Sequence, residues 1–326
     1  MSPVPGERFT GMAPSDAGER EFAHQVNRHR RELHVHCYRM LGSFDEAEDL
    51  VQETFLRAWR HRESFEGGSG LRAWLYRIAT NACLDAIRRK GRRVEEVSSF
   101  AEIPWLQPYP DRLLEEVAPR ADEPDAVVVA RETIELGFLA LIQLLPARQR
   151  AVLILRDVLE FSAQETADAL ETSVASVNSA LQRARATLGD RAPAPRAEWS
   201  ADAELSDEER ELLRGFIETH ESGDHAAAIR LMAEDIRVTM PPNPSVYDGI
   251  DALRPLLERA DDMGGWKLLP TRLNRMPAAA SYRRAPGARE YTPFKLDVLR
   301  VRDGAIAEIT TFGVAHFAEL GLPPVL

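Results

Sequence analysis

Two proline-rich stretches divide this chain of 326 residues and constrain its fold more than any other feature of the sequence. Five prolines between residues 94 and 126 exclude a long helix there. Residues 191–196, with the sequence RAPAPR, have the composition of a semi-rigid spacer. We therefore expect three folded units, joined by linkers at 94–126 and 191–202. The expected units are 19–93 and 127–190, both helical in pattern, and 203–326, which mixes helix and strand.

The composition is that of a globular protein in a reducing compartment. Hydrophobic residues make up 44% of the chain and charged residues 29%, which excludes wholesale disorder and a fibrous protein. We find no run of about 18 apolar residues, and the first residues lack the apolar segment of a signal peptide. Because two cysteines form no disulfide framework, we expect a cytoplasmic protein.

The formal net charge of −11 argues at first against a nucleic-acid partner, because DNA phosphates repel an acidic protein. The cations, however, are almost all arginine, since lysine occurs at only three of the 41 Lys and Arg positions. The planar guanidinium group suits paired hydrogen bonds to phosphate. Cations also concentrate locally at 88–93, so the sign of the net charge excludes less than it first suggests.

The first unit contains an amphipathic helix with a distinct polar face. Ser43 is a suitable N-cap for a helix over 44–61, whose apolar residues recur at helical spacing. Asp49, Gln52 and Glu53 stand at i, i+3 and i+4, so they share another face of this helix. From the pattern alone, that face is either a solvated acidic stripe or a binding surface.

A glycine-containing loop, Phe65–Gly70, precedes a second long helix in this unit. The loop does not have the context of a nucleotide-binding loop, because no strand precedes it. The helix carries Trp74 and Tyr76 and ends in the basic run 88–93, with Gly91 as the expected C-cap. A basic end can serve the helix dipole alone, but aromatic, amide and basic side chains together also suit the binding of single-stranded bases.

The same unit holds three residues of types that bind metals, His34, His36 and Cys37. Positions i and i+2 of a helix point in nearly opposite directions, so these side chains cannot bind one ion together. We expect a structural role for them and no metal site.

The second unit has the pattern of a helix-turn-helix. Ser162 and Glu165 form a capping box at the start of one helix, and a short turn leads into another helix over 174–188. In such a motif the second helix enters the major groove of DNA. Helical hairpins with other functions share this pattern, so the motif alone does not establish DNA binding.

The third unit begins with helices and continues with strands, which indicates an α+β fold with a curved antiparallel sheet. We expect helices over 206–222, 226–233 and 249–260, and strands over 236–241, 266–273, 278–284 and 291–302. Asp303 and Gly304 form a strong signal for a type I′ hairpin that leads into a last strand over 305–312.

Three stretches of sequence carry a resemblance to known families. Residues 45–59, DEAEDLVQETFLRAW, and 71–85, LRAWLYRIATNACLD, resemble region 2 of bacterial sigma-70 family factors. Residues 145–157, LPARQRAVLILRD, with the helix-turn-helix that follows, resemble region 4. The chain is most similar to the extracytoplasmic-function (ECF) group, which has only these two regions. The turn at 301–309 resembles that of SnoaL-like domains in the NTF2-like superfamily, so the implied fold is two all-α sigma domains followed by an α+β cone.

The resemblance implies a sigma factor, which binds core RNA polymerase, recognises promoter DNA and promotes transcription initiation. The residues implied in polymerase binding are Asp49, Gln52 and Glu53. Those implied in binding the minus-ten element, from which a base is flipped, are Phe65, Ser69, Arg77, Asn81, Arg88, Arg89 and Arg93. Those implied in reading the minus-thirty-five element are Ser176, Asn178, Ser179, Gln182, Arg183 and Arg185. Many ECF factors carry arginine where this chain has Asn178 and Ala180, so we expect a weaker electrostatic contribution here.

The SnoaL-like unit would enclose a regulatory pocket, for which the expected lining residues are Met240, Trp266, Tyr282 and Phe312. His220, Asp235 and Tyr282 could serve acid–base chemistry, but no spacing marks them as a pair. The resemblance implies a domain that contacts the sigma domains and tunes their activity, with an unidentified small molecule as an optional ligand. We expect no enzymatic activity and no cofactor.

Two other functions remain open on the sequence. A ligand-responsive helix-turn-helix regulator would bind duplex DNA tightly by itself, whereas a sigma factor of this net charge would bind it weakly without polymerase. A SnoaL-type enzyme with a helical appendage would leave the long resemblance over 19–93 without an explanation.

Overall fold

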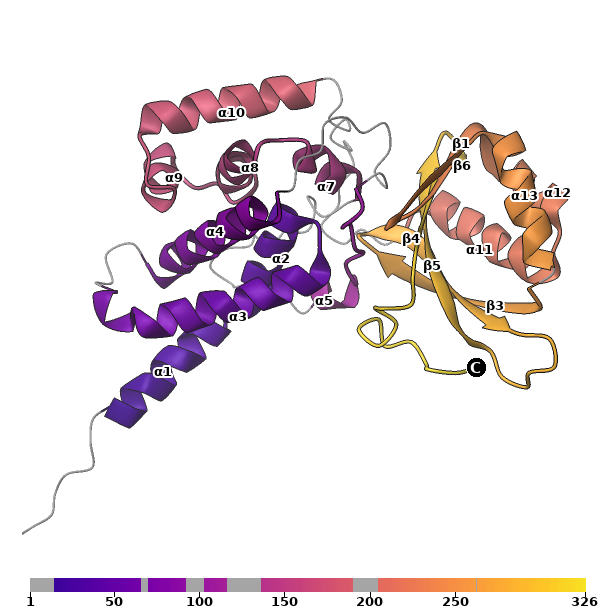
Figure 1. Cartoon of the computed structure of the whole chain (residues 1–326), viewed down its shortest axis with the longest axis horizontal. Coiled ribbons are helices and arrows are strands. Elements are labelled where there is room, and N and C mark those ends of the chain that lie inside the picture. Colours follow the sequence, from indigo (N-terminus) through magenta and orange to yellow (C-terminus); the bar gives the residue numbers. More distant parts are fainter. Residues whose placement is uncertain (1–14, 66–69, 92–102, 116–135, 190–204, 262) are drawn as a thin grey trace, which may run out of the picture.

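The computed structural model describes residues 15–65, 70–91, 103–115, 136–189, 205–261 and 263–326. Two helical units lie side by side, and a unit built on a sheet lies next to them (Figure 1). The first unit comprises α1 (Ser15–Asn27), α2 (Arg30–Leu41), α3 (Phe44–Arg60), the 3-10 helix η1 (Arg62–Ser64) and α4 (Leu71–Lys90). The second comprises α7 (Leu136–Gln143), α8 (Ala147–Leu153), the π-helical turn η3 (Ile154–Val158), α9 (Ala163–Ala169) and α10 (Val174–Leu188).

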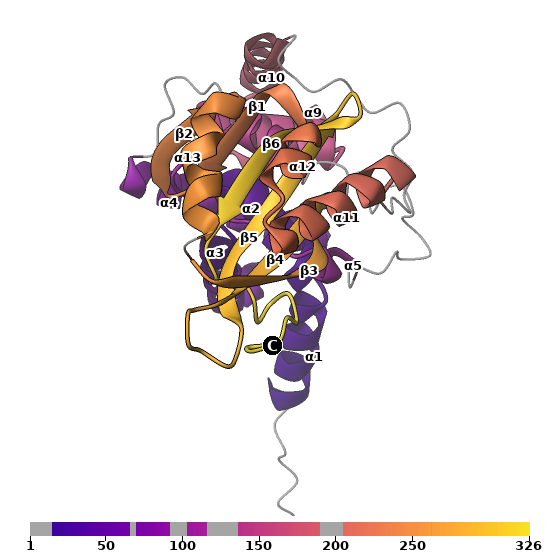
Figure 2. The ribbon, with the colours of Figure 1, turned by 90° about the vertical axis from the view of Figure 1, so that its right-hand side faces the viewer.

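The third unit has helices on one face of a six-stranded sheet. The helices are α11 (Asp207–Ser222), α12 (His225–Arg230) and α13 (Ile250–Asp261). The strands are β1 (Met232–Met240), β2 (Asn243–Asp248), β3 (Gly265–Leu273), β4 (Met276–Arg284), β5 (Thr292–Arg302) and β6 (Ala305–Phe312). Their order across the sheet is β2-β1-β6-β5-β4-β3. Figure 2 shows the three helices in front of the sheet.

Local signals in the sequence produce the ends of these elements as predicted. The side chain of Ser43 accepts a hydrogen bond from the Glu46 N–H at the start of α3. Ser162 and Glu165 form both bonds of the capping box on α9. Gly91 ends α4 in the left-handed conformation. Asp303 has a positive φ, as a type I′ turn requires, so β5 and β6 form the predicted hairpin.

The sheet differs from the prediction in three ways. β1 begins at Met232, inside the stretch 226–233 that was predicted as a helix. The sheet is mixed rather than antiparallel, because β1 pairs in parallel with β6. After β2 the chain crosses to the opposite edge of the sheet at β3, and β4 and β5 lead back to β6, which lies beside β1. The strand β2 was not predicted, and it contains Pro244. A proline is tolerated there because β2 is an edge strand. On an edge strand some backbone N–H groups face away from the sheet, so a residue without an N–H loses no hydrogen bond at such a position.

The two faces of the sheet belong to different hydrophobic cores. Ala278, Ala280, Leu296 and Val298 belong to a core that continues into the helical units. Ile236, Leu268 and Ile309 pack on the other face with Leu212 and Phe216 of α11. The sheet therefore separates the helical units from the space beneath α11–α13. Within the described part of the chain, no helix is both long and apolar enough to cross a membrane.

Histidines 34 and 36 have the structural role that we expected of them. His34 Nδ1 lies 3.0 Å from the Tyr109 hydroxyl, and His36 Nε2 lies 2.9 Å from the Thr80 hydroxyl. Burial lowers the pKa of His34 to about 4 and that of His36 to about 3, so both rings are neutral at pH 7. Cys37 is buried in the same core.

The predicted linker 94–126 is packed, not solvated, where the structure describes it. Residues 103–115 form no helix longer than α5 (Arg112–Glu115), in agreement with the prolines. Tyr109 in this segment is nevertheless fully buried, with its ring 4.9 Å from that of Tyr38 and 5.3 Å from that of Phe44. The segment is thus a structural layer between the first unit and the sheet.

Asn274, in the turn between β3 and β4, fastens the third unit to this layer. Its side chain is fully buried; Nδ2 donates to the Tyr38 hydroxyl at 3.0 Å, and Oδ1 accepts from the Tyr109 N–H at 2.8 Å. The Asn274 N–H also donates to the Tyr109 carbonyl at 2.9 Å. Next to it, the Arg275 N–H donates to Asp111 Oδ1 at 2.8 Å. Both turn residues have positive φ, 53° and 61°, which asparagine tolerates better than most residues.

We expect the substitution Asn274→Gly to loosen this junction, because it removes two buried hydrogen bonds without straining the left-handed turn. If the free energy of local opening falls by about 2 kcal/mol, the equilibrium constant for opening rises about 30-fold. Hydrogen–deuterium exchange of the Tyr109 and Asn274 amides measures this opening. Arg275→Gly is the matched control, since it changes the same turn and leaves both amide bonds in place; equal exchange in the two variants would contradict the assignment.

Candidate functional site

The polar face of α3 is open to solvent. Asp49 and Gln52 are exposed, whereas Glu53 is half-buried and accepts a hydrogen bond from Arg57 Nε at 2.7 Å. Leu56 continues the same face, four residues after Gln52, and is 53% exposed. Leu56 was not among the predicted residues, although its position off the apolar stripe of α3 was a usable signal. The face therefore combines polar groups with one large apolar side chain.

The face of α4 that carries Arg77 and Asn81 contacts the second helical unit, although Arg77 is exposed and Asn81 is half-buried. Arg77 Nη2 donates to Glu171 Oε1 at 2.9 Å, and Asn81 Nδ2 donates to the Ala169 carbonyl at 3.3 Å. Ala169 is the last residue of α9, and Glu171 follows it in the turn of the helix-turn-helix. Two predicted minus-ten residues thus contact the second helical unit.

The other predicted minus-ten residues lie at the two ends of α4. Phe65 is half-buried, with its ring 5.2 Å from that of Trp74. Arg88 and Arg89 are exposed, and Arg88 Nη1 lies 3.4 Å from Asp85 Oδ1. Ser69 and Arg93 lie outside the described residues.

A second junction between the helical units involves the buried guanidinium of Arg150 on α8. It is 3% exposed and donates to the carbonyl groups of Met40, at the end of α2, and Ile142, at the end of α7. Gln143 adds a bond from its Nε2 to the Arg39 carbonyl at 3.1 Å. Carbonyl oxygens at helix C-termini are favourable partners for a buried cation, so this arrangement offsets much of its desolvation.

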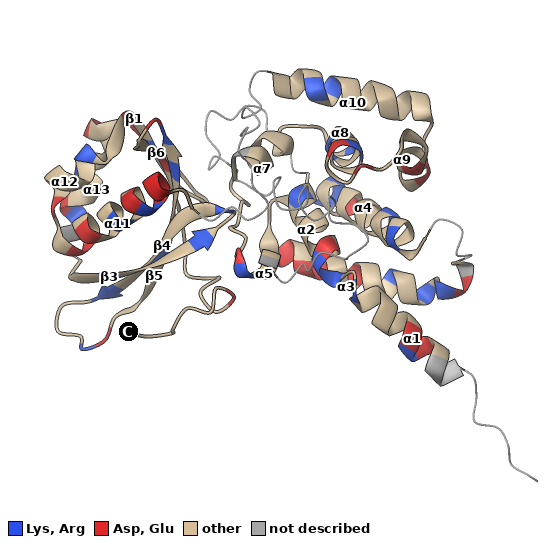
Figure 3. Ribbon diagram, turned by 180° about the vertical axis from the view of Figure 1, so that it is seen from behind, with Lys and Arg blue, Asp and Glu red and all other residues tan. Residues whose placement is uncertain are grey.

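The helix α10 presents all six predicted minus-thirty-five residues on its exposed side, while Val177 and Leu181 pack inward. The exposed residues are Ser176, Asn178, Ser179, Gln182, Arg183 and Arg185. Figure 1 places α10 on the outside of the molecule, and Figure 3 shows that most of it is uncharged. Arg185 forms a two-point ion pair with Asp157, at 2.9 and 2.7 Å, which raises the pKa of its guanidinium further. One of the two cations on α10 is therefore already paired with a carboxylate.

The third unit encloses a cavity of about 420 Å³ between the sheet and its helices. Met240, Trp266 and Phe312 line it, as does His220. Tyr282 does not, which corrects the predicted lining. Side chains of β4 alternate between the two faces of the sheet, and Tyr282 points to the face toward the helical units, where its hydroxyl donates to the Pro323 carbonyl at 2.8 Å. Asp235 is also outside the cavity and pairs with Arg302.

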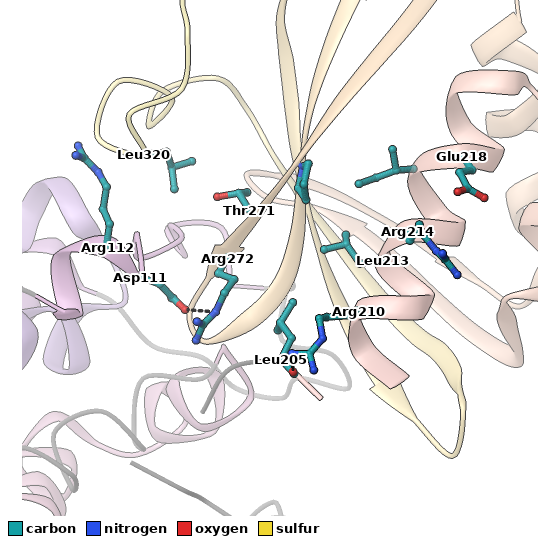
Figure 4. A pocket seen from close by; sticks show the side chains of 12 residues that line it. Asp111, Arg112, Leu205, Arg210, Leu213, Arg214, Glu218, Thr271, Arg272 and Leu320 are labelled. Carbon is teal, nitrogen blue, oxygen red and sulfur yellow. Dashed lines mark hydrogen bonds and ion pairs between the residues drawn. The ribbon is translucent and has the colours of Figure 1, made fainter. Parts of the chain in front are cut away.

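A second cleft, of about 740 Å³, lies where the third unit meets the packed linker (Figure 4). Its walls come from α11, β3 and residues Asp111 and Arg112. The ion pair between Arg272 Nε and Asp111 Oδ2, at 3.3 Å, crosses the boundary. The cleft thus lies beside the junction between the third unit and the packed linker to which Asn274 contributes.

Comparison with known proteins establishes the family. Residues 25–93 match Sigma-70 region 2, and residues 136–188 match Sigma-70, region 4. The ECF RNA polymerase sigma factor SigG of Mycobacterium tuberculosis is 38% identical over 334 residues, which cover 97% of this chain and 88% of SigG. The chain belongs to the ECF sigma factors. As such it binds core RNA polymerase, recognises promoter DNA and promotes the initiation of transcription.

Other relatives of this ECF sigma factor differ in how much of the chain they match. SigW of Bacillus subtilis is 34% identical over 169 residues, which cover 51% of this chain and 86% of SigW. The crystal structure of SigJ from Mycobacterium tuberculosis covers 94% of this chain and 99% of SigJ, with a TM-score of 0.58 and 21% identity. The similarity to SigJ is one of fold, and it includes the C-terminal domain of this ECF sigma factor.

We expect Leu56→Ser to weaken binding of this sigma factor to core RNA polymerase about tenfold, since burying a leucine contributes roughly 1.5–3 kcal/mol. The thermal stability of the free chain should not change, because Leu56 is exposed. Titration of labelled sigma factor with core enzyme measures the affinity. Val314→Ser removes another exposed apolar side chain, in the C-terminal domain, and is the matched control. Equal affinities for the two variants would exclude Leu56 from the contact.

Proposed function

We propose that this ECF sigma factor is held in a closed form by its own domains and that core RNA polymerase opens it in the cytoplasm. In the closed form, region 4 covers the minus-ten face of region 2. The observation that carries the proposal is the pair of contacts from Arg77 to Glu171 and from Asn81 to the Ala169 carbonyl. These groups are not available to promoter DNA while the contacts persist.

The dimensions of a promoter support the same conclusion. The names of the two elements place them about 25 base pairs apart, which corresponds to roughly 80 Å of duplex DNA. In this structure Asn81 contacts Ala169, and α10 begins five residues later, at Val174. Because α10 is about 22 Å long, both reading surfaces lie much closer together than 80 Å. The closed form cannot read both elements at once, so region 4 must separate from region 2.

The contacts at α4 are of a strength that a partner can overcome, and opening must also break the buried hydrogen bond from Arg150 to the Met40 carbonyl. The Arg77–Glu171 ion pair is exposed, and such pairs contribute at most about 1 kcal/mol. The ring contact between Tyr76 and Phe161, at 5.6 Å, adds an amount of the same order. The exposed face of α3 is free to bind polymerase before the domains separate. Binding energy at α3 can thus be coupled to opening.

We further propose that the SnoaL-like domain shifts the equilibrium between the closed and open forms through its contacts with region 2 and the linker, and not as an enzyme. Through Asn274 it fixes the position of Tyr38 on α2 and of Tyr109 in the linker between regions 2 and 4. The end of α2 is also where Arg150 of region 4 binds. A change in the contacts of Asn274 would therefore alter the same part of region 2 that region 4 contacts.

Energy transfer between two dyes tests the opening. Cys37 and Cys83 are buried, so Arg89→Cys on α4 and Ala186→Cys on α10 would be labelled selectively. We expect high transfer in the free chain and a loss of transfer when core RNA polymerase is added. Unchanged transfer in a complex that is shown to have formed would refute the closed form.

The charge reversal Glu171→Arg should open the free chain without polymerase, because it replaces the attraction to Arg77 by repulsion. A change of about 1 kcal/mol raises the open population roughly fivefold, which appears as lower transfer between the same dyes. Glu160→Arg is the matched control, since Glu160 is also exposed and also has a positive φ. Reconstituted transcription with core enzyme then measures function; no promoter-specific transcript from any candidate promoter would count against sigma activity itself.

A further inference from the structure

The cavity of the SnoaL-like domain is walled by aromatic and sulfur-containing side chains. Phe216, Trp266, Phe294 and Phe312 contribute rings, and Met232, Met240 and Met263 contribute thioethers. Its volume of about 420 Å³ lies in the range of sites for small molecules. Rings favour offset or edge-to-face contact with another flat ring, and methionine adapts to its outline. The walls therefore suit a flat, mostly apolar guest.

Nε2 of His220, which lines this cavity, is a buried polar atom that the described residues leave without a hydrogen-bond partner. His220 projects from α11, and its ring lies 5.5 Å from that of Phe216 and 5.2 Å from that of Trp266. Its Nε2 atom is buried and has no hydrogen-bond partner among the described residues. Burial lowers the pKa of His220 to about 3, so the ring is neutral and Nε2 can take part in one hydrogen bond. A buried polar group without a partner is unfavourable, and a bound molecule can supply the partner.

The charged groups in the cavity, by contrast, already compensate each other. Asp297 is fully buried, with Oδ2 3.0 Å from Lys295 Nζ. Its Oδ1 accepts a hydrogen bond from Thr311 at 2.7 Å, and Ser281 donates to Oδ2 at 3.3 Å. Lys295 also lies over the ring of Trp266, at 5.9 Å. Among the lining residues that the structure describes, none deep in the cavity carries an uncompensated charge that would attract an ion, and Arg259 lies exposed at the edge.

We propose that this cavity binds a neutral fused-ring aromatic molecule with one hydroxyl or carbonyl oxygen, which forms a hydrogen bond with Nε2 of His220. The rings and thioethers contact the apolar part, and the Lys295–Asp297 pair stays intact beneath it. This site is distinct from the surfaces that bind polymerase and DNA. The inference stands on the cavity alone and does not require the closed form proposed above.

Isothermal titration of the full chain at pH 7 with three related probes tests the chemistry of the site. The probes are 2-naphthol, naphthalene and the anion 2-naphthoate, which share the ring system and differ in the polar group. We expect 2-naphthol to bind about fivefold more tightly than naphthalene, as one neutral hydrogen bond provides. Binding of naphthalene as tight as that of 2-naphthol, or tighter binding of 2-naphthoate, would overturn the proposal.

The variant His220→Phe separates the hydrogen bond from the apolar contacts, because it keeps a ring at this position and removes both nitrogens. We expect it to bind naphthalene as before and to lose the preference for 2-naphthol. His24→Phe, at an exposed position on α1, is the matched control and should keep the preference. A preference that survives in His220→Phe would place the oxygen elsewhere and refute the proposal.

Spectroscopy of the unmodified protein provides a readout that does not depend on the folding of the variant. In protein labelled with ¹⁵N-histidine, 2-naphthol should shift the Nε2 signal of His220, which burial separates from those of exposed histidines such as His24. Naphthalene should leave the nitrogen signal close to its position in the free protein. An Nε2 signal that does not respond to saturating 2-naphthol would contradict the assigned hydrogen bond.

Discussion

The buried amide of Asn274 is the interaction on which the arrangement of the C-terminal domain depends. It joins three segments that are far apart in the chain: α2 through Tyr38, the linker through Tyr109, and the turn between β3 and β4. A buried amide is stable only when its donors and acceptors are all matched, so it permits few alternative orientations of the groups around it. One sheet face therefore meets the helical domains, and the cavity on the other face opens away from them.

The helical domains show a different kind of contact, in which side chains that are predicted to bind DNA join the two domains. Arg77 and Asn81, which the family resemblance assigns to DNA, make their hydrogen bonds to region 4 instead. Such contacts are individually weak, which is what an exchange of partners requires. The acidic balance of the chain acts in the same direction, because it disfavours binding to bulk DNA until polymerase supplies the rest of the interface.

Much of the local structure was predictable because it depends on neighbouring residues. Ser43, the Ser162–Glu165 capping box and the Asp303-Gly304 turn act within three or four positions, and all three occur as the sequence indicated. The strand β2 escaped prediction because an edge position, which the sequence does not reveal, is what makes Pro244 acceptable. Tyr282 was assigned to the wrong face because alternation along β4 does not show which face encloses a cavity.

The sequence by itself determined the order of the domains and most helices with their caps, and it predicted the residues that a sigma factor would use. Periodicity and capping describe interactions over a few residues, and a long resemblance transfers roles by position. Only the tertiary structure decided that Arg77 meets Glu171, 94 positions later, and that Asn274 meets Tyr38, 236 positions earlier. Such pairs depend on the complementarity of whole surfaces, which no local pattern in the sequence encodes. In the closed form that we propose, the arginine and asparagine that the resemblance assigns to promoter DNA bind region 4 instead.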